Sequence, residues 1–325
     1  MPEIVRSVNL DANEALFFAS QLEYVKAKTY QIEYAILKAT KLIPVSFEAG
    51  PGAETIAYRE FDSFGVAKII ANYADDLPRA DVKGNEYVSR VRSIGASYGY
   101  SIQEIRAAMM AGQNLEQRKA NAVRQAFDTK INSIGWFGDA DFGLKGLIYN
   151  PNITSSAAPD GASTNTMWSP GGGVVDKTPD EILKDMNDLV NGILATTKGN
   201  EFPDTLLMPI VNYTHISVTP RSATSDTTIL EFFLRNNPLI TTVEWVNELG
   251  DLVGNGHEAV VGGADSSNLM IAYRKSPDVL TFEIPQPFEQ FPAQERGLEF
   301  IVPTHGRCGG VIVYKPLAIA MLEGI

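Results

Sequence analysis

The sequence predicts an α+β protein, because strong helical segments and short apolar strands both occur without regular alternation. Residues 101–134 and 178–198 each begin with a capping box and continue with apolar residues at helical spacing. The second half of the chain adds short apolar and β-branched runs that are typical of strands. With 325 residues, the chain is long enough to bury a substantial core without disulfides.

The N-terminal segment predicts a helix over residues 11–39. Asp11 can cap its first turn, and Glu14 follows at capping-box spacing. Its apolar stripe is irregular, so we expect this segment to gain order from a neighbouring surface. Pro44 stops the helix.

Residues 54–100 predict a long hairpin with a first arm at 55–70 and a return arm at 87–98. Between the arms, charged residues, Pro78 and Gly84 mark an exposed tip. Two long arms with few strand neighbours are marginally stable in isolation. The hairpin therefore predicts a partner chain.

Residues 101–134 carry the strongest helical pattern. Ser101 and Glu104 form the capping box, and the apolar face would run about 50 Å at 1.5 Å per residue. Gly112 predicts a kink or a break within it. The helix is expected to end at Gly135.

Residues 150–177 read as a long polar loop, and a helix over 178–198 follows it. Thr178 is its N-cap, Glu181 completes the capping box, and Gly199 can close the helix in a left-handed conformation. The remaining elements are a short helix at 226–236 and strands at 205–211, 241–246, 268–273, 279–284, 298–302 and 311–314.

Few residues point to catalysis or metal binding. The chain has three histidines, and His305 precedes Cys308, the one cysteine, by three positions. In an extended strand those two side chains point to opposite faces, so a buried thiol is the better interpretation than a catalytic pair. Two such residues also cannot close a zinc site.

The remaining motifs are incomplete. Residues 171–173 are three glycines without the Lys-Ser/Thr pair of a phosphate-binding loop, and residues 254–256 lack the third glycine of a dinucleotide fingerprint. Asp139 and Asp141 lack the other ligands of a calcium loop. We predict no catalytic residue, no metal and no cofactor, and thus a protein that is not an enzyme.

The formal net charge of −12 argues against a protein that reads nucleic-acid sequence, which needs a cationic face. The N-terminus lacks the pattern of a secretory signal, and the longest apolar runs are far too short to span a bilayer. A single cysteine excludes an intrachain disulfide and fits a reducing compartment. These observations predict a soluble, non-secreted protein.

The order of these elements resembles the Hong Kong 97 capsid fold of tailed-bacteriophage major capsid proteins. The end of the long helix over 125–138, the segment 146–151 and the C-terminal strands carry the likeness, with Arg307 in a turn and a Pro-x-Ala pattern at Pro316. The resemblance implies an α+β fold with an N-terminal arm, an extended loop, a spine helix, and peripheral and axial domains. Their expected bounds are 1–45 for the arm, 46–100 for the extended hairpin loop, 101–149 for the spine helix and peripheral domain, 150–284 for the axial domain, 285–308 for peripheral return strands and 309–325 for a closing axial strand.

The same resemblance implies a structural head protein that assembles with itself into hexamers and pentamers of an icosahedral shell around double-stranded DNA. Scaffolding, portal and decoration proteins would be further partners, the DNA would be held without sequence-specific binding, and no membrane would take part. The protein would be found in the virion after assembly in the bacterial host cytoplasm. The hairpin of one subunit would cross the spine helix of its neighbour, and the candidate inter-subunit contacts are Asp75, Asp76, Arg79, Lys83, Arg118 and Arg124.

Two alternatives stay open at this point. An encapsulin-like nanocompartment shell shares the fold but encloses cargo enzymes, and an adjacent cargo-enzyme gene would favour it. An independent enzyme would instead be a compact monomer or small oligomer with a defined pocket and with the hairpin folded onto its own body.

Overall fold

The structure is a computed structural model that describes residues 35–65, 79–110, 115–162, 166–168, 177–222, 224, 226–261 and 267–325. The chain divides into two compact units, Met1–Ile36 and Leu37–Ile325, and all of the described strands belong to the second unit. Most of the helix predicted over 11–39 lies outside the described residues. Within the described part, no helix is both long and apolar enough to cross a membrane.

A five-stranded mixed sheet with the order β7-β16-β10-β8-β9 forms the centre of one half of the second unit. Its strands are β7 (Thr154–Ala157), β16 (Ile319–Glu323), β10 (Leu269–Tyr273), β8 (Thr205–Met208) and β9 (Thr242–Trp245). All residues of β8 and β10 are buried, as expected for central strands that are covered on both faces. Strands β7 and β9 are the two edges.

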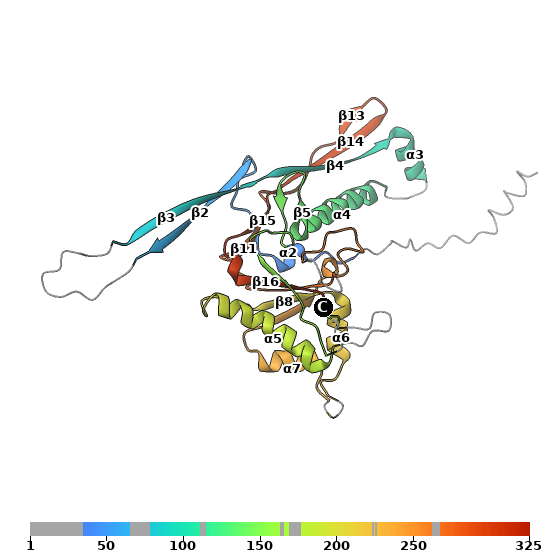
Figure 1. Cartoon of the computed structure of the whole chain (residues 1–325). Coiled ribbons are helices and arrows are strands. Elements are labelled where there is room, and N and C mark those ends of the chain that lie inside the picture. The colour runs from blue at the N-terminus through green and yellow to red at the C-terminus, as the bar shows by residue number, and fades with distance from the viewer. Residues whose placement is uncertain are drawn as a thin grey trace, which may run out of the picture. The chain divides into compact units, whose positions relative to one another are not determined.

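Three helices cover one face of this sheet (Figure 1): α5 (Pro179–Thr196), α6 (Ile210–Val218) and α7 (Ile229–Asn236). The predicted capping box of α5 is confirmed, since the Thr178 side chain accepts from the Glu181 backbone N–H and Glu181 accepts from the Thr178 N–H. Gly199 has the predicted left-handed conformation, with φ of +75°. Local sequence chemistry therefore fixed both ends of this helix.

A buried ion pair ties α5 to the segment before it. Lys177 Nζ lies 2.5 Å from Asp185 Oδ2, and the same oxygen accepts from Trp168 Nε1 at 2.9 Å. Burial raises the pKa of Asp185, while the hydrogen bonds from Lys177 and Trp168 oppose that rise. The pair therefore holds two separate positions of the predicted 150–177 loop against the helix.

Two predictions for this half are wrong in detail. The strand expected over 205–211 ends at Met208, because Pro209 takes the N-cap position and α6 begins at Ile210. The segment expected to be loop throughout 150–177 contains β7, which pairs in parallel with β16. Strand β16 lies so far along the chain that the local sequence of β7 does not predict the pairing.

A second sheet, with the order β1-β11-β15, lies beside α4 (Leu115–Trp136). Its strands are β1 (Val45–Ser46), β11 (Leu280–Glu283) and β15 (Gly310–Val313). The short helix α2 (Ala39–Leu42) packs on α4, where Asn132 Oδ1 accepts from the backbone N–H groups of Lys38 and Ala39. The chain is thus fixed in the core at the point where the described part begins.

The third sheet contains β12 (Gln286–Gln290), β14 (Glu299–Cys308) and β13 (Gln294–Arg296), with β4 (Arg92–Ser101) paired to β14. Helix α4 packs against β4, and the capping box of Ser101 and Glu104 starts α3 (Ile102–Met110) as predicted. The helical segment predicted over 101–134 is described as two helices, and Gly112, where a kink or a break was predicted, lies between them and outside the described residues. Helix α4 alone, with 22 residues, is about 33 Å long.

The hairpin consists of β2 (Thr55–Phe64) and β3 (Asp81–Arg90), which pair over their whole length. The predicted return arm over 87–98 is wrong beyond Arg90, because β4 leaves β2 and pairs with β14 instead. Figure 1 shows the β2–β3 ribbon running away from the three sheets.

The expectation of one closing strand over 309–325 is also wrong. Pro316 begins a 3-10 turn, η2 (Pro316–Ala318), that separates β15 from β16. The two strands then join different sheets, β15 beside β11 and β16 beside β10. The C-terminal segment thus links the second sheet to the five-stranded sheet.

Candidate assembly surfaces

The β2–β3 ribbon has one apolar face. Residues directly opposite in an antiparallel pair share a face, and the register pairs Ala57 with Val88 and Phe61 with Gly84. Alternation then places Val82 on the same face. Phe61, Val82 and Val88 are 66%, 58% and 60% exposed, so this face has no cover within the described part of the chain.

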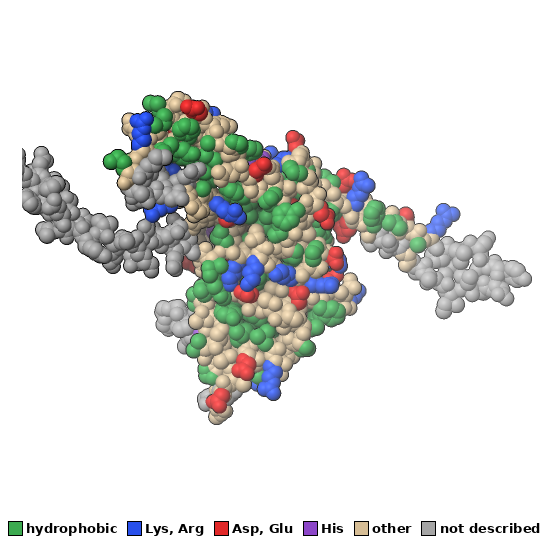
Figure 2. Space-filling view, turned by 180° about the vertical axis from the view of Figure 1, so that it is seen from behind, with side chains coloured by type: hydrophobic (Ala, Val, Ile, Leu, Met, Phe, Trp, Pro, Cys, Tyr) green, Lys and Arg blue, Asp and Glu red, His purple; other side chains and the backbone are tan. Residues whose placement is uncertain are grey.

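Glycine 84 shapes this face. A Cβ at Gly84 would lie 3.1 Å from the ring of Phe61, so a side chain at this position would crowd the ring. Arg59 and Glu86 form a salt bridge of 2.9 Å on the same face. Figure 2 shows hydrophobic side chains on the ribbon surface between charged ones. A two-stranded ribbon with such a face is marginally stable alone and is suited to burial against another chain.

The root of the ribbon is fixed by aromatic contacts. Tyr58 stacks on Tyr87 with ring centroids 5.2 Å apart and meets Tyr314 edge-on at 5.0 Å. The Tyr314 hydroxyl lies 3.0 Å from Thr281 Oγ1, and Ser89 Oγ donates to the carbonyl of Gly309. Partial burial raises the pKa of Tyr58 and of Tyr314, so both stay neutral hydrogen-bonding groups at physiological pH. This contact sets the direction in which the ribbon leaves the body.

Helix α4 supplies a second candidate surface. Its inward side buries Phe127, Ile131 and Ile134 in the core. Arg124 lies one turn before Phe127, 3.8 Å from Asp128, and its guanidinium is 5.6 Å from the ring of Phe288. Its side chain is nevertheless 66% exposed, so the helix presents a positive charge at the rim of this packed side.

The candidate contact residues fall at separate places. Asp75 and Asp76 lie outside the described residues. Arg79 is exposed just before β3, while Lys83 lies inside β3 and not in a tip loop, which corrects the expected extent of the tip. Arg118 and Arg124 both lie on α4. The four described candidates thus lie on two different elements, the ribbon and α4, and their role between chains stays a prediction.

Sequence reasoning missed the apolar face of the ribbon. The signal was present as apolar residues at alternate positions of both strands, but only the register places Phe61, Val82 and Val88 on one side. Charged residues indicated only that the hairpin tip is exposed. The exposed apolar residues are the stronger indication of a contact between chains, since burial of apolar area drives association.

The cysteine prediction is confirmed. Cys308 is fully buried, and burial raises the pKa of its thiol to about 12. His305 lies on the other side of β14, half-buried, where it pairs with Gly95 of β4 and Glu289 of β12. The two side chains do not form a nucleophile and base.

Comparisons with known proteins show a family, through one family model, and a fold, through solved structures. A family model described as major capsid protein matches residues 65–325. The capsid of Myoviridae phage XM1 superimposes with a TM-score of 0.78 at 21% identity, covering 94% of this chain and 98% of that one. A chain from Mycobacterium phage Adephagia gives a TM-score of 0.61 at 11% identity, covering 99% and 98%.

A third structure, the capsid of a native GTA particle, gives a TM-score of 0.60 at 11% identity and covers 97% of this chain and 99% of that one. No curated protein sequence matches the chain. At these identities the structural likeness establishes the fold, which is the Hong Kong 97-like α+β fold that the sequence predicted. The family model covers more than half of the chain, so it shows the family as well as the fold.

Proposed function

Because the chain belongs to the major capsid protein family, we propose that its copies form hexamers and pentamers that close into an icosahedral shell around double-stranded DNA. The protein is a structural component of the virion capsid, not an enzyme, and assembles into shells with itself. The observation that carries the proposal is the β2–β3 ribbon, whose exposed apolar face of Phe61, Val82 and Val88 calls for a second chain.

The ribbon of one subunit would cover part of its neighbour, with its apolar face down. The spine helix α4 and the adjoining β4–β14 sheet are the expected target, and Arg118 and Arg124 would then pair with Asp75 or Asp76 of the neighbour. Many modest contacts repeated by symmetry stabilise a closed assembly without any single tight interface. The domain bounds from 1–45 to 309–325 remain part of the proposal, with two strands, β15 and β16, in the last segment.

Scaffolding, portal and decoration proteins are proposed as further partners. The net charge of −12 supports a shell that holds its DNA without sequence-specific binding, because the protein would gain little from neutralising phosphates. Assembly in the cytoplasm of a bacterial host is part of the same proposal.

The test is to express the chain alone and together with its neighbouring genes, and to image the products by negative-stain electron microscopy. Closed shells or capsomer rings are expected. Nuclease-protected DNA in particles made during infection would support a genome container, whereas cargo enzymes in the particles would favour a nanocompartment. A stable monomer under every condition would overturn the proposal.

A further inference from the structure

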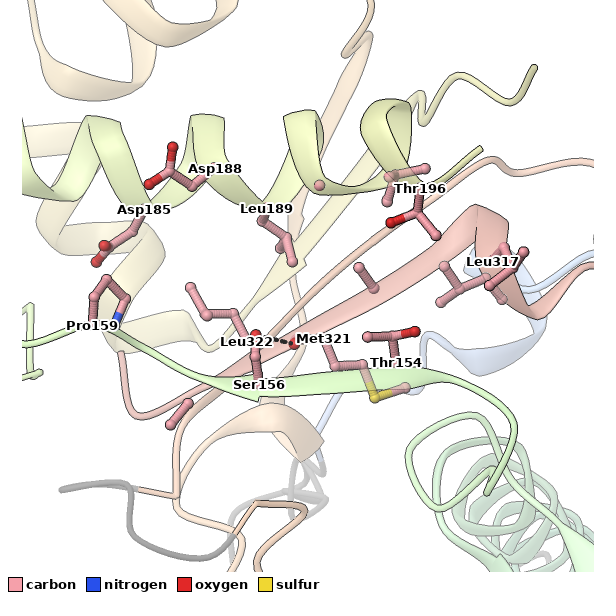
Figure 3. A pocket seen from close by; sticks show the side chains of 15 residues that line it. Thr154, Ser156, Pro159, Asp185, Asp188, Leu189, Thr196, Leu317, Met321 and Leu322 are labelled. Carbon is pink, nitrogen blue, oxygen red and sulfur yellow. Dashed lines mark hydrogen bonds between the residues drawn. The ribbon is translucent and has the colours of Figure 1, made fainter. Parts of the chain in front are cut away.

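A cleft of about 260 Å³ opens between α5 and the edge strand β7 (Figure 3). Its floor is apolar, formed by Leu189, Ile193 and Leu322, while Thr154 and Ser156 of β7 line the opposite wall. The lining includes the carboxylates of Asp185 and Asp188 and no lysine, arginine or histidine. Asp185 is neutralised by Lys177, so Asp188 is the open charge at this rim.

Open space lies beside Gly192 at the cleft. Gly192 lies in the interior of α5 and lines the cleft, and a Cβ at this position would meet no atom within 4 Å. A glycine in a helix interior costs about 1 kcal/mol relative to alanine. No packing within the described part of the chain requires that cost. The free space above Gly192 is therefore available to another molecule.

The opposite edge of the same sheet carries an unpartnered apolar ridge. Helix α6 packs beside the edge strand β9 and buries Asn212 and Ile216. Its other side presents Val211 and Val218, which are 57% and 74% exposed. His215 lies between them at helical spacings of four and three residues, so the three side chains share one face.

Ring assembly needs two unlike surfaces on each copy, because contacts within a ring are head-to-tail. We propose that the α6 face of one copy, formed by Val211, His215 and Val218, seats in the α5–β7 cleft of the next copy in the capsomer. This inference rests on the proposed function and names the contact that closes the ring of axial domains.

Charge and surface chemistry favour a second copy as the occupant. The valines match the apolar floor and the half-exposed Leu317 at the rim of the cleft. In the proposed contact His215 would lie beside Asp188, which makes no ion pair within the described part of the chain. The cleft and the ridge lie at opposite edges of one sheet, so one copy can make both contacts at the same time with two different neighbours.

The test is disulfide cross-linking in assembled particles of the full chain. The double variant Gly192→Cys with Val218→Cys places one thiol in the cleft and one on the ridge, while Cys308 is buried and does not react. Mild oxidation should yield a ladder of linked subunits up to the capsomer ring on a non-reducing gel. Each single variant should run on this gel as unlinked subunits. A control pair that combines Asn191→Cys, on an exposed part of α5, with Val218→Cys should also stay unlinked.

Particles that form normally but yield no ladder from the Gly192 and Val218 pair would overturn the inference and leave the proposed function intact. A charge exchange decides the case in which the cysteine pair does not assemble. Asp188→Arg should raise the protein concentration needed for assembly about fivefold, as expected for the loss of one rim ion pair. Adding His215→Asp should restore the wild-type value, and failure to restore it would count against the contact.

Discussion

Phe61 of β2 and Leu206 of β8 are both apolar residues on strands, yet Leu206 is fully buried and Phe61 is largely exposed. The five-stranded sheet finds its cover within its own chain, on one face from α5, α6 and α7. The β2–β3 ribbon finds none on its apolar face within the described part of the chain. The five-stranded half thus buries its apolar residues within its own chain, whereas the ribbon leaves apolar residues exposed that assembly can bury.

Because of this difference, the stability of the folded chain and the stability of the assembled shell should depend on different residues. Substitutions in the five-stranded half should change the free energy of unfolding of the unassembled chain. Substitutions on the ribbon face should leave that free energy nearly unchanged and alter the yield of shells. The two quantities are measured independently, so the comparison is open to test at each region.

The largest expected effect is in the core of the five-stranded half. Phe233→Ala on α7 removes a fully buried ring, and we expect the free energy of unfolding to fall by about 3–5 kcal/mol. Chemical denaturation of the unassembled chain, followed by circular dichroism, measures it. Leu234→Ala, at the neighbouring position of the same helix, is the matched control: its side chain is 38% exposed, and its loss should stay below about 1 kcal/mol. Equal losses would contradict the assignment of this core.

The buried ion pair should give the next largest effect. Lys177→Met leaves Asp185 buried without its cation, and a loss of about 3 kcal/mol is expected at pH 7 because Trp168 still donates to the carboxylate. Replacing both partners, as Lys177→Met with Asp185→Leu, should recover most of that loss. A double variant as unstable as the single one would show that the charge is not the cause.

The same variant has a predictable pH dependence. Burial already raises the pKa of Asp185, and removing Lys177 removes an interaction that lowers it. An acid with a raised pKa in the folded state stabilises the protein most when protonated, and that stability is lost as pH rises through the raised pKa. The Lys177→Met variant should therefore regain stability relative to wild type between pH 7 and pH 5. A stability difference that stays constant over this range would contradict the sign.

The sequence predicted those parts of the fold that depend on neighbours along the chain. The capping boxes at Ser101 and Thr178 were correct because both partners lie within one helical turn. The return arm of the hairpin was wrong beyond Arg90, since β4 pairs with β14 about two hundred positions later in the chain. Strand β7 was not predicted for the same reason: its sequence is short and polar, and it forms a strand because it pairs with β16. Long-range pairing leaves no local trace when the strand itself lacks a strong pattern.

The sequence predicted that the hairpin contacts another chain, but it did not identify the apolar residues on the exposed face. The sequence indicated that the hairpin needs a partner chain, and it selected charged residues such as Lys83. The structure adds the register, which places Phe61 and Val88 on one face and Lys83 on the other. Faces of a ribbon follow from pairing, so no analysis of one strand alone could have identified them.

The root of the ribbon should show a smaller effect than either core change. Tyr314→Phe removes the hydroxyl that lies 3.0 Å from Thr281, and a loss of about 1 kcal/mol is expected. Thr281 still donates to Glu283, which limits the damage. Hydrogen exchange of the β2 and β3 amides should speed up more than exchange in β10. Uniform acceleration across both regions would mean that the root does not act on the ribbon specifically.

The smallest folding effect, and the most direct test of the comparison, belongs to the ribbon face. Phe61→Ser combined with Val88→Ser removes two side chains that are already 66% and 60% exposed, so unfolding of the unassembled chain should change by less than about 1 kcal/mol. Shell yield, counted by electron microscopy at matched protein concentration, should fall sharply because every copy loses the same contact. Asn85→Ala, on the opposite face of β3, is the control and should assemble as wild type does. If the serine variant assembled normally, or if it lost several kcal/mol as a monomer, the ribbon face would belong to its own chain and not to a neighbour.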